Sequence, residues 1–286
     1  MEMILHVLPL LVFTTCAGAA AGAYAVDALF GSAAARSANE GFTLRRAWLF
    51  PLVCLVLLGV GLCGTLAHLG QPLRFVNGLS NPASGISQEA YWSIALGVVI
   101  IVDTLLTWRV KRPMRAVRWL GAVIAVGLMV VTGMAYFDCL GLVVWRGAAT
   151  VPLFVVGDLV LGVGLCTLLA GLSSDGAMRD VRGSASDRLG CGGRANAVLL
   201  AANVAMQIAF AAVLVAYGLY LAREGMPATG LLVFAGAAGP ACASAASIAA
   251  RAGVLPGKAA GIAVCVLSLV SVVVSRYAFF AAGMGA

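Results

Sequence analysis

Long apolar runs, separated by short polar connections, follow one another from the beginning to the end of this sequence. Each run has roughly 20 residues or more, enough for a helix to cross a hydrocarbon core about 30 Å thick. Backbone amides in lipid must be bonded within their own segment, so the runs are expected to be helical. The expected helices lie near residues 3–30, 47–69, 88–108, 116–138, 150–171, 195–222, 228–250 and 258–282. The pattern predicts an all-α, polytopic protein of about eight transmembrane helices, with residues 1–286 forming a single integral membrane domain.

The composition agrees with this pattern. Hydrophobic residues make up 62% of the chain and charged residues only 10%, and the mean hydropathy is +1.04. A soluble domain carries about 25% charged residues. The first run carries Glu2 and no early basic residue. A cleavable signal peptide needs a basic start and a shorter apolar core, so we interpret this run as a retained helix.

The basic residues predict the orientation of the chain. Fourteen of the 18 fall in alternate connections: Arg36, Arg45, Arg46, Arg109, Lys111, Arg112, Arg115, Arg118, Arg179, Arg182, Arg188, Arg194, Arg251 and Lys258. The opposite connections hold only Arg74, Arg146 and Arg223. Because short cytoplasmic connections are enriched in Lys and Arg, both termini are expected on the outer side of the cell (inner, cytoplasmic) membrane. We therefore attribute the net charge of +7 to basic residues that set the topology, and not to the binding of nucleic acid.

Few residues are suited to holding a metal or a redox group. The eight cysteines form no Cys-x-x-Cys pair, which argues against an iron–sulfur cluster in this chain. There are two histidines, His6 and His68, fewer than a di-haem membrane cytochrome needs as axial ligands. We expect no haem, no cluster and no metal site. Gly59-Val-Gly61-Leu-Cys-Gly64 matches a dinucleotide fingerprint as a string, but it lies inside an apolar run and is expected to pack helices.

One connection expected on the outer side is flanked by residues that could take part in catalysis or binding. His68 is expected to end the second helix, and Ser87 to cap the third, with Glu89 in its first turn. The last helix starts near Lys258, and the 18 residues from there to Arg276 span about 27 Å. Arg276 is therefore expected at the same outer level of the membrane as His68 and Glu89. A buried arginine needs a partner, and Glu89 is the expected one.

Such a group of residues is suited to quinol oxidation, which removes two protons and two electrons. A neutral imidazole and a carboxylate can accept the protons, and an arginine can stabilise a developing quinolate. The competing interpretation is that His68 and Arg74 bind lipid headgroups while Glu89 and Arg276 form a structural pair. Asp27 and Asp103 are expected near cytoplasmic helix ends, solvated or paired with arginines of the connections. Asp158, about two turns into the fifth helix, is a candidate to line a cavity.

At these residues the chain resembles the membrane-anchor subunit of dimethyl-sulfoxide-reductase-type molybdoenzymes. The resemblance rests on His68-Leu-Gly-x-Pro72-x-Arg74-x-x-Asn77, on Ser84, Ser87 and Glu89, and on Arg276-Tyr-Ala-Phe279-Phe280. Eight helices with both ends outside also agree with this family.

The resemblance implies a non-haem subunit that binds and oxidises menaquinol in anaerobic respiration and is not an enzyme by itself. Electrons would pass to a partner with four [4Fe-4S] clusters and then to a molybdopterin subunit. The resemblance implies that His68 and Glu89 bind and oxidise the quinol. Arg74 and Arg276 are added on physical grounds, and with Ser84 and Ser87 they are expected to bind quinol or support the site. Two alternatives stay open. One is a secondary transporter of a small solute, and the other is a purely structural membrane scaffold.

Overall fold

The structure is a computed structural model that describes residues 2–31, 48–68, 79–180 and 192–285. Within these ranges there are helices and no strands, and eight spans are long and apolar enough to cross a membrane. The expected all-α membrane fold is therefore confirmed. The helices are α1 (Glu2–Val26, continued by the π-turn η1, Asp27–Gly31), α4 (Leu49–His68), α6 (Gly85–Val110), α7 (Arg115–Phe137), α8 (Thr150–Asp180), α9 (Gly192–Arg223), α10 (Pro227–Gly236), α11 (Ala238–Arg251) and α12 (Gly257–Gly285).

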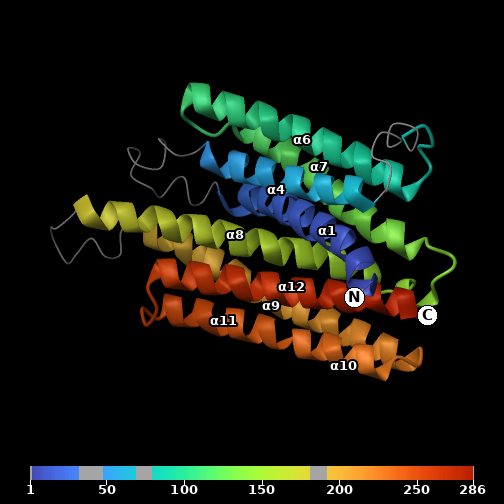
Figure 1. The fold of residues 1–286 in the computed structure, drawn as a ribbon. Helices are drawn as coiled ribbons and strands as arrows, with labels where there is room; N and C mark the ends of the chain where they lie inside the picture. Colours follow the sequence, from blue (N-terminus) through green and yellow to red (C-terminus); the bar gives the residue numbers. More distant parts are fainter. Residues whose placement is uncertain (1, 32–47, 69–78, 181–191, 286) are drawn as a thin grey trace.

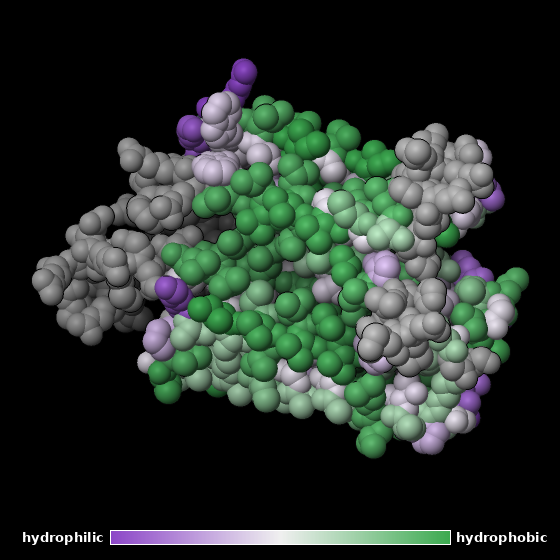
Figure 2. All heavy atoms as spheres, viewed as in Figure 1, coloured by the Kyte–Doolittle hydropathy of each residue, from purple (hydrophilic) through white to green (hydrophobic). Residues whose placement is uncertain are grey.

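The helices run side by side as one bundle (Figure 1). α1 begins and α12 ends at the same end of the bundle, which is called the terminal end below. α1 is the central helix and packs against α4, α7 and α8, with α6 outside α4 and α7, and α9 to α12 on the other side of α8. Apolar residues cover the middle of the face drawn in Figure 2, and polar residues lie toward its two ends, as expected for a surface in contact with lipid.

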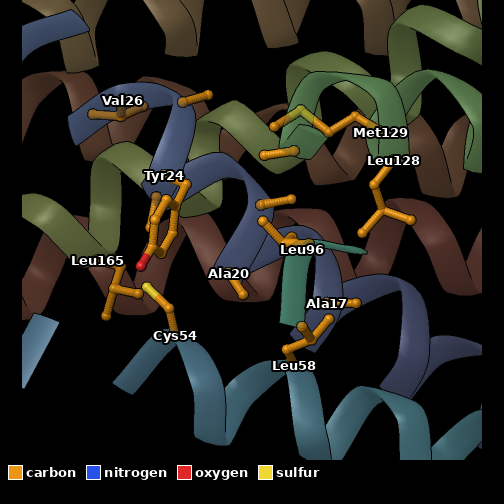
Figure 3. Close-up of a cluster of buried hydrophobic side chains, with 14 of the residues drawn as sticks. Ala17, Ala20, Tyr24, Val26, Cys54, Leu58, Leu96, Leu128, Met129 and Leu165 are labelled. Carbon is orange, nitrogen blue, oxygen red and sulfur yellow. The ribbon is translucent and has the colours of Figure 1, made fainter. Parts of the chain in front are cut away.

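Small residues bring α1 close to its neighbours. Ala17 and Ala20 face Leu58, Leu96 and Leu128 in the larger of two apolar clusters (Figure 3). A Cβ atom on Gly64 would lie 2.8 Å from the backbone of α1, so this glycine of α4 packs against α1. Gly61 and Gly64 of the string that resembles a dinucleotide fingerprint thus pack α4 against α1, as expected, whereas a Cβ atom on Gly59 would meet nothing within 4 Å.

One expected boundary is wrong, and one helix has a break that was not expected. The fifth helix was expected to end near residue 171, yet α8 continues to Asp180, so its Ser- and Asp-containing last turns belong to the helix. The seventh helix was expected to be continuous over residues 228–250, yet it divides at Ala237 into α10 and α11. The cause is Pro240, which has no N–H to donate to Gly236 four residues earlier. The Ser271 hydroxyl of α12 donates to that carbonyl instead, at 2.7 Å.

Candidate functional site

The candidate site is built around Glu89 at the terminal end of α6. The helix begins at Gly85 with Ser84 as its N-cap, so the prediction that Ser87 caps it is wrong. Asn81 starts the helix early, because its Oδ1 accepts the N–H of Ala83 at 3.2 Å and its carbonyl accepts that of Ser84 at 3.1 Å. Glu89 therefore lies one turn deeper than expected.

This carboxylate is buried among helices. Glu89 is 9% exposed, and none of the described residues bonds to its Oε1. Thr132, which is buried on α7, is its polar neighbour. One turn further along α6, the hydroxyl of Ser93 is also buried with no described partner. Polar atoms inside proteins are normally bonded, so this group of acceptors and hydroxyls is suited to receiving a polar ligand.

Tyr136 forms the next wall of the site. It lies four residues after Thr132, on the same face of α7. Its ring stacks on Phe154 of α8, with centroids 5.0 Å apart and planes at 12°. The rings of Trp145, Phe279 and Phe280 meet it edge-on at 5.4 to 5.5 Å. Tyr136 is thus held by aromatic packing where α7, α8 and α12 come together.

The expected pair of Glu89 and Arg276 is not formed. The guanidinium of Arg276 instead donates through Nη2 to Oδ1 of Asp158 on α8. The reason is the order of the helices, because α12 packs against α8 and α1, whereas α6 packs against α7 and α4. The neighbours of Arg276 were therefore not predicted correctly. Tyr136 is within electrostatic reach of both Glu89 and Arg276.

The remaining predicted residues have different outcomes. His68 is the last residue of α4, which packs against α6 and ends where α6 begins, so its backbone lies at the terminal end. The side chain of His68 and the whole of Arg74 lie outside the described residues. Ser87 is buried inside α6. No three His, Cys, Asp or Glu side chains are placed to hold a metal ion in the described part of the chain.

Sequence reasoning missed Thr132 and Tyr136 and gave Asp158 no partner. A signal for the first two was present, because their spacing of four residues at the end of an apolar helix places both on one face. For Asp158, the signal was a single carboxylate inside an apolar run, which requires a cation.

A second polar group lies at the opposite end of the bundle. Arg118 of α7 donates to Asp27 at 2.6 Å and to Asp103 at 2.7 Å, as expected for these carboxylates. Tyr24 and Thr107 also donate to Asp103, at 2.9 and 3.0 Å. The described charges of this group are all paired, and its bonds link α1, α6 and α7.

Comparison with known proteins agrees with these features. No curated protein matches the chain. The family model of the DMSO reductase anchor subunit (DmsC) matches residues 1–181, more than half of the 286 residues. The matched part carries Glu89, Thr132, Tyr136 and Asp158. The chain therefore belongs to the DMSO reductase anchor subunit (DmsC) family and is the membrane anchor of an oxidoreductase complex of that type, with catalytic and iron–sulfur subunits as its partners.

Proposed function

We propose that this anchor binds and oxidises menaquinol at the terminal end of the bundle and passes the electrons to its iron–sulfur partner. The observation that carries the proposal is Glu89, a buried carboxylate with an unpartnered oxygen beside Thr132 and Tyr136. Glu89 is four residues from the start of α6, so the site lies close to the terminal end of the bundle.

The reaction balances with the residues proposed for it. Quinol gives up two protons and two electrons to become quinone. Glu89 accepts one proton and His68, at the end of the neighbouring helix, accepts the other. The electrons leave one at a time for the iron–sulfur partner, which in this proposal holds four [4Fe-4S] clusters and delivers them to a molybdopterin subunit. Arg74, Ser84 and Ser87 support the site, as the motif around them implies.

The orientation belongs to the same proposal. The terminal end faces the outer side of the inner membrane, so the protons of the quinol are released there. Support comes from the exposed basic residues of the opposite end, among them Arg109, Arg112 and Arg251, because such residues mark the cytoplasmic side.

The test uses the whole complex in membranes. Two electron donors are compared, menadiol, which requires the quinol site, and a reduced viologen dye, which delivers electrons without it. Glu89→Gln keeps the size of the side chain and removes its function as a base. We expect menadiol-driven turnover to fall by about 100-fold or more, with viologen-driven turnover unchanged.

Glu224→Gln is the matched control, because Glu224 is exposed and follows α9 at the same terminal end. It should leave both activities at the wild-type level. His68→Ala tests the second proton acceptor in the same assay. If Glu89→Gln and His68→Ala both retain full menadiol-driven turnover in assembled complex, the proposed function is wrong.

A further inference from the structure

Arg276 has hydrogen-bonding capacity that its known partner does not use. The side chain is 1% exposed, which makes it the largest fully buried side chain among the described residues. Nη2 bonds to Asp158, while Nε and Nη1 have no partner in the described part of the molecule. A buried donor without a partner is destabilising, and more so when it is charged. A purely structural ion pair would be expected to use these donors as well.

Asp158 is held in one position by the crossing of α1 and α8. A Cβ atom on Gly18 would lie 2.0 Å from Oδ1 of Asp158, and one on Gly22 would lie 1.8 Å from its backbone oxygen. Glycine at these two positions is therefore what admits Asp158 against α1. Asp158 is 3% exposed, and Arg276 is the partner to which its side chain bonds.

The unused donors lie next to the proposed quinol site. Phe154 is four residues before Asp158, on the same face of α8. The guanidinium carbon of Arg276 lies 5.1 Å from the centroid of the Phe154 ring, and the same ring stacks on Tyr136. Phe154 thus contacts both Tyr136 and Arg276, and Tyr136 follows Thr132, the polar neighbour of Glu89, on the same face of α7.

We propose that Arg276 is the second ligand-binding group of the site, donating through Nε and Nη1 to the quinol oxygen farther from Glu89, and that Asp158 is the positioning residue that aims it. This inference rests on the proposed function. The guanidinium supplies fixed donors where negative charge grows as the quinol loses its protons. Asp158 neutralises the cation in lipid and leaves the two remaining N–H directions for the ligand.

Arg276→Lys separates this role from a structural one. Lysine keeps the charge and the pair with Asp158 but replaces the planar fork of donors by a single ammonium group. We expect the complex to assemble, the KM for menadiol to rise by about tenfold or more, and viologen-driven turnover to stay unchanged. Binding of menadione to the purified complex, measured by calorimetry, should weaken by a similar factor.

Asp158→Asn tests the positioning role. Because Asp158 acts through Arg276, Asp158→Asn should raise the same KM, and the double variant with Arg276→Lys should be no worse than the poorer single variant. Asp103→Asn is the matched control, since it alters an equally buried carboxylate of an ion pair at the opposite end. The assembled complex that carries Asp103→Asn should have the wild-type KM for menadiol.

The outcomes separate the two proposals. If Arg276→Lys leaves both the KM and menadione binding at wild-type values, the pair is structural and the inference fails, whatever Glu89→Gln does. Additive effects of the two variants would show that Asp158 does not act through Arg276. If Glu89→Gln is harmless while Arg276→Lys weakens menadione binding, the proton acceptor is wrong but the role of Arg276 stands. If the complex with Asp158→Asn does not assemble, the result for Arg276→Lys alone decides whether the inference stands.

Discussion

The backbones of Gly22 on α1 and Gly162 on α8 touch where the two helices cross, and a Cβ atom on Gly162 would fall 2.1 Å from the carbonyl carbon of Gly22. No side chain can rotate away from such a contact, because both partners are backbone. The crossing lies one turn beyond Asp158, so its closeness also determines where the Asp158–Arg276 pair sits.

Gly162→Val should therefore force α1 and α8 apart and destabilise the protein by about 3 kcal/mol. The midpoint of thermal unfolding in detergent measures the effect. Gly59→Val is the control, because a Cβ atom on Gly59 meets nothing within 4 Å. Equal midpoints for the two variants would contradict a close-packed crossing.

Arg118→Gln should be more damaging than the loss of either of its carboxylate partners. It leaves Asp103 fully buried without its cation, which costs about 3–5 kcal/mol for a buried pair. Asp27 is only partly buried, so Asp27→Asn should cost much less. The amount of folded protein recovered from membranes and its thermal midpoint provide the comparison. A milder effect of Arg118→Gln than of Asp27→Asn would be inconsistent with this network.

Ser271→Ala should weaken the packing of α12 against the break between α10 and α11. It removes the hydroxyl that satisfies the Gly236 carbonyl and should lower stability by about 1 kcal/mol. Ser275→Ala is a matched control, because Ser275 is equally buried but bonds within its own helix, to Val272. If the control loses as much stability as Ser271→Ala, the bond across the helices contributes nothing.

Reporter fusions test the orientation. Alkaline phosphatase, active only outside the cytoplasm, should be active when fused after residue 286 and inactive when fused after Lys111. A fluorescent protein that folds only in the cytoplasm should give the opposite result at both sites. The reverse pattern would place the terminal end, and with it the proposed quinol site, on the cytoplasmic side.

Much of the fold follows from the sequence because hydropathy directly reports the lengths of segments that cross a membrane. The partner of Asp27 and Asp103 was predictable for a similar reason, since charges at the same end of neighbouring helices have few alternatives. The partner of Arg276 was not predictable. Hydropathy gives the depth of a residue along a helix but does not tell which helices are neighbours, so Glu89 was expected and Asp158 was overlooked.

The candidate site, like the fold, could be predicted only in part from the sequence. Glu89 was identified from the sequence, but the start of its helix was not, because Asn81 and Ser84 compete with Ser87 as turn and cap residues. The helix break was missed although Pro240 signals it, because the apolar run continues across it. Thr132 and Tyr136 belong to the site only through the packing of α6 against α7, a contact that no local pattern encodes.

The ion pair between Asp158 and Arg276 joins two parts of the chain that differ in how they relate to the family. Asp158 lies inside the part that the family model matches, whereas Arg276 lies 95 residues beyond its end at residue 181. A chimera that takes its first five helices from this protein and the rest from another anchor would carry an uncompensated carboxylate in its interior unless the donor supplies a cation at the position of Arg276. Exchanging helices between anchors therefore requires exchanging both members of this pair.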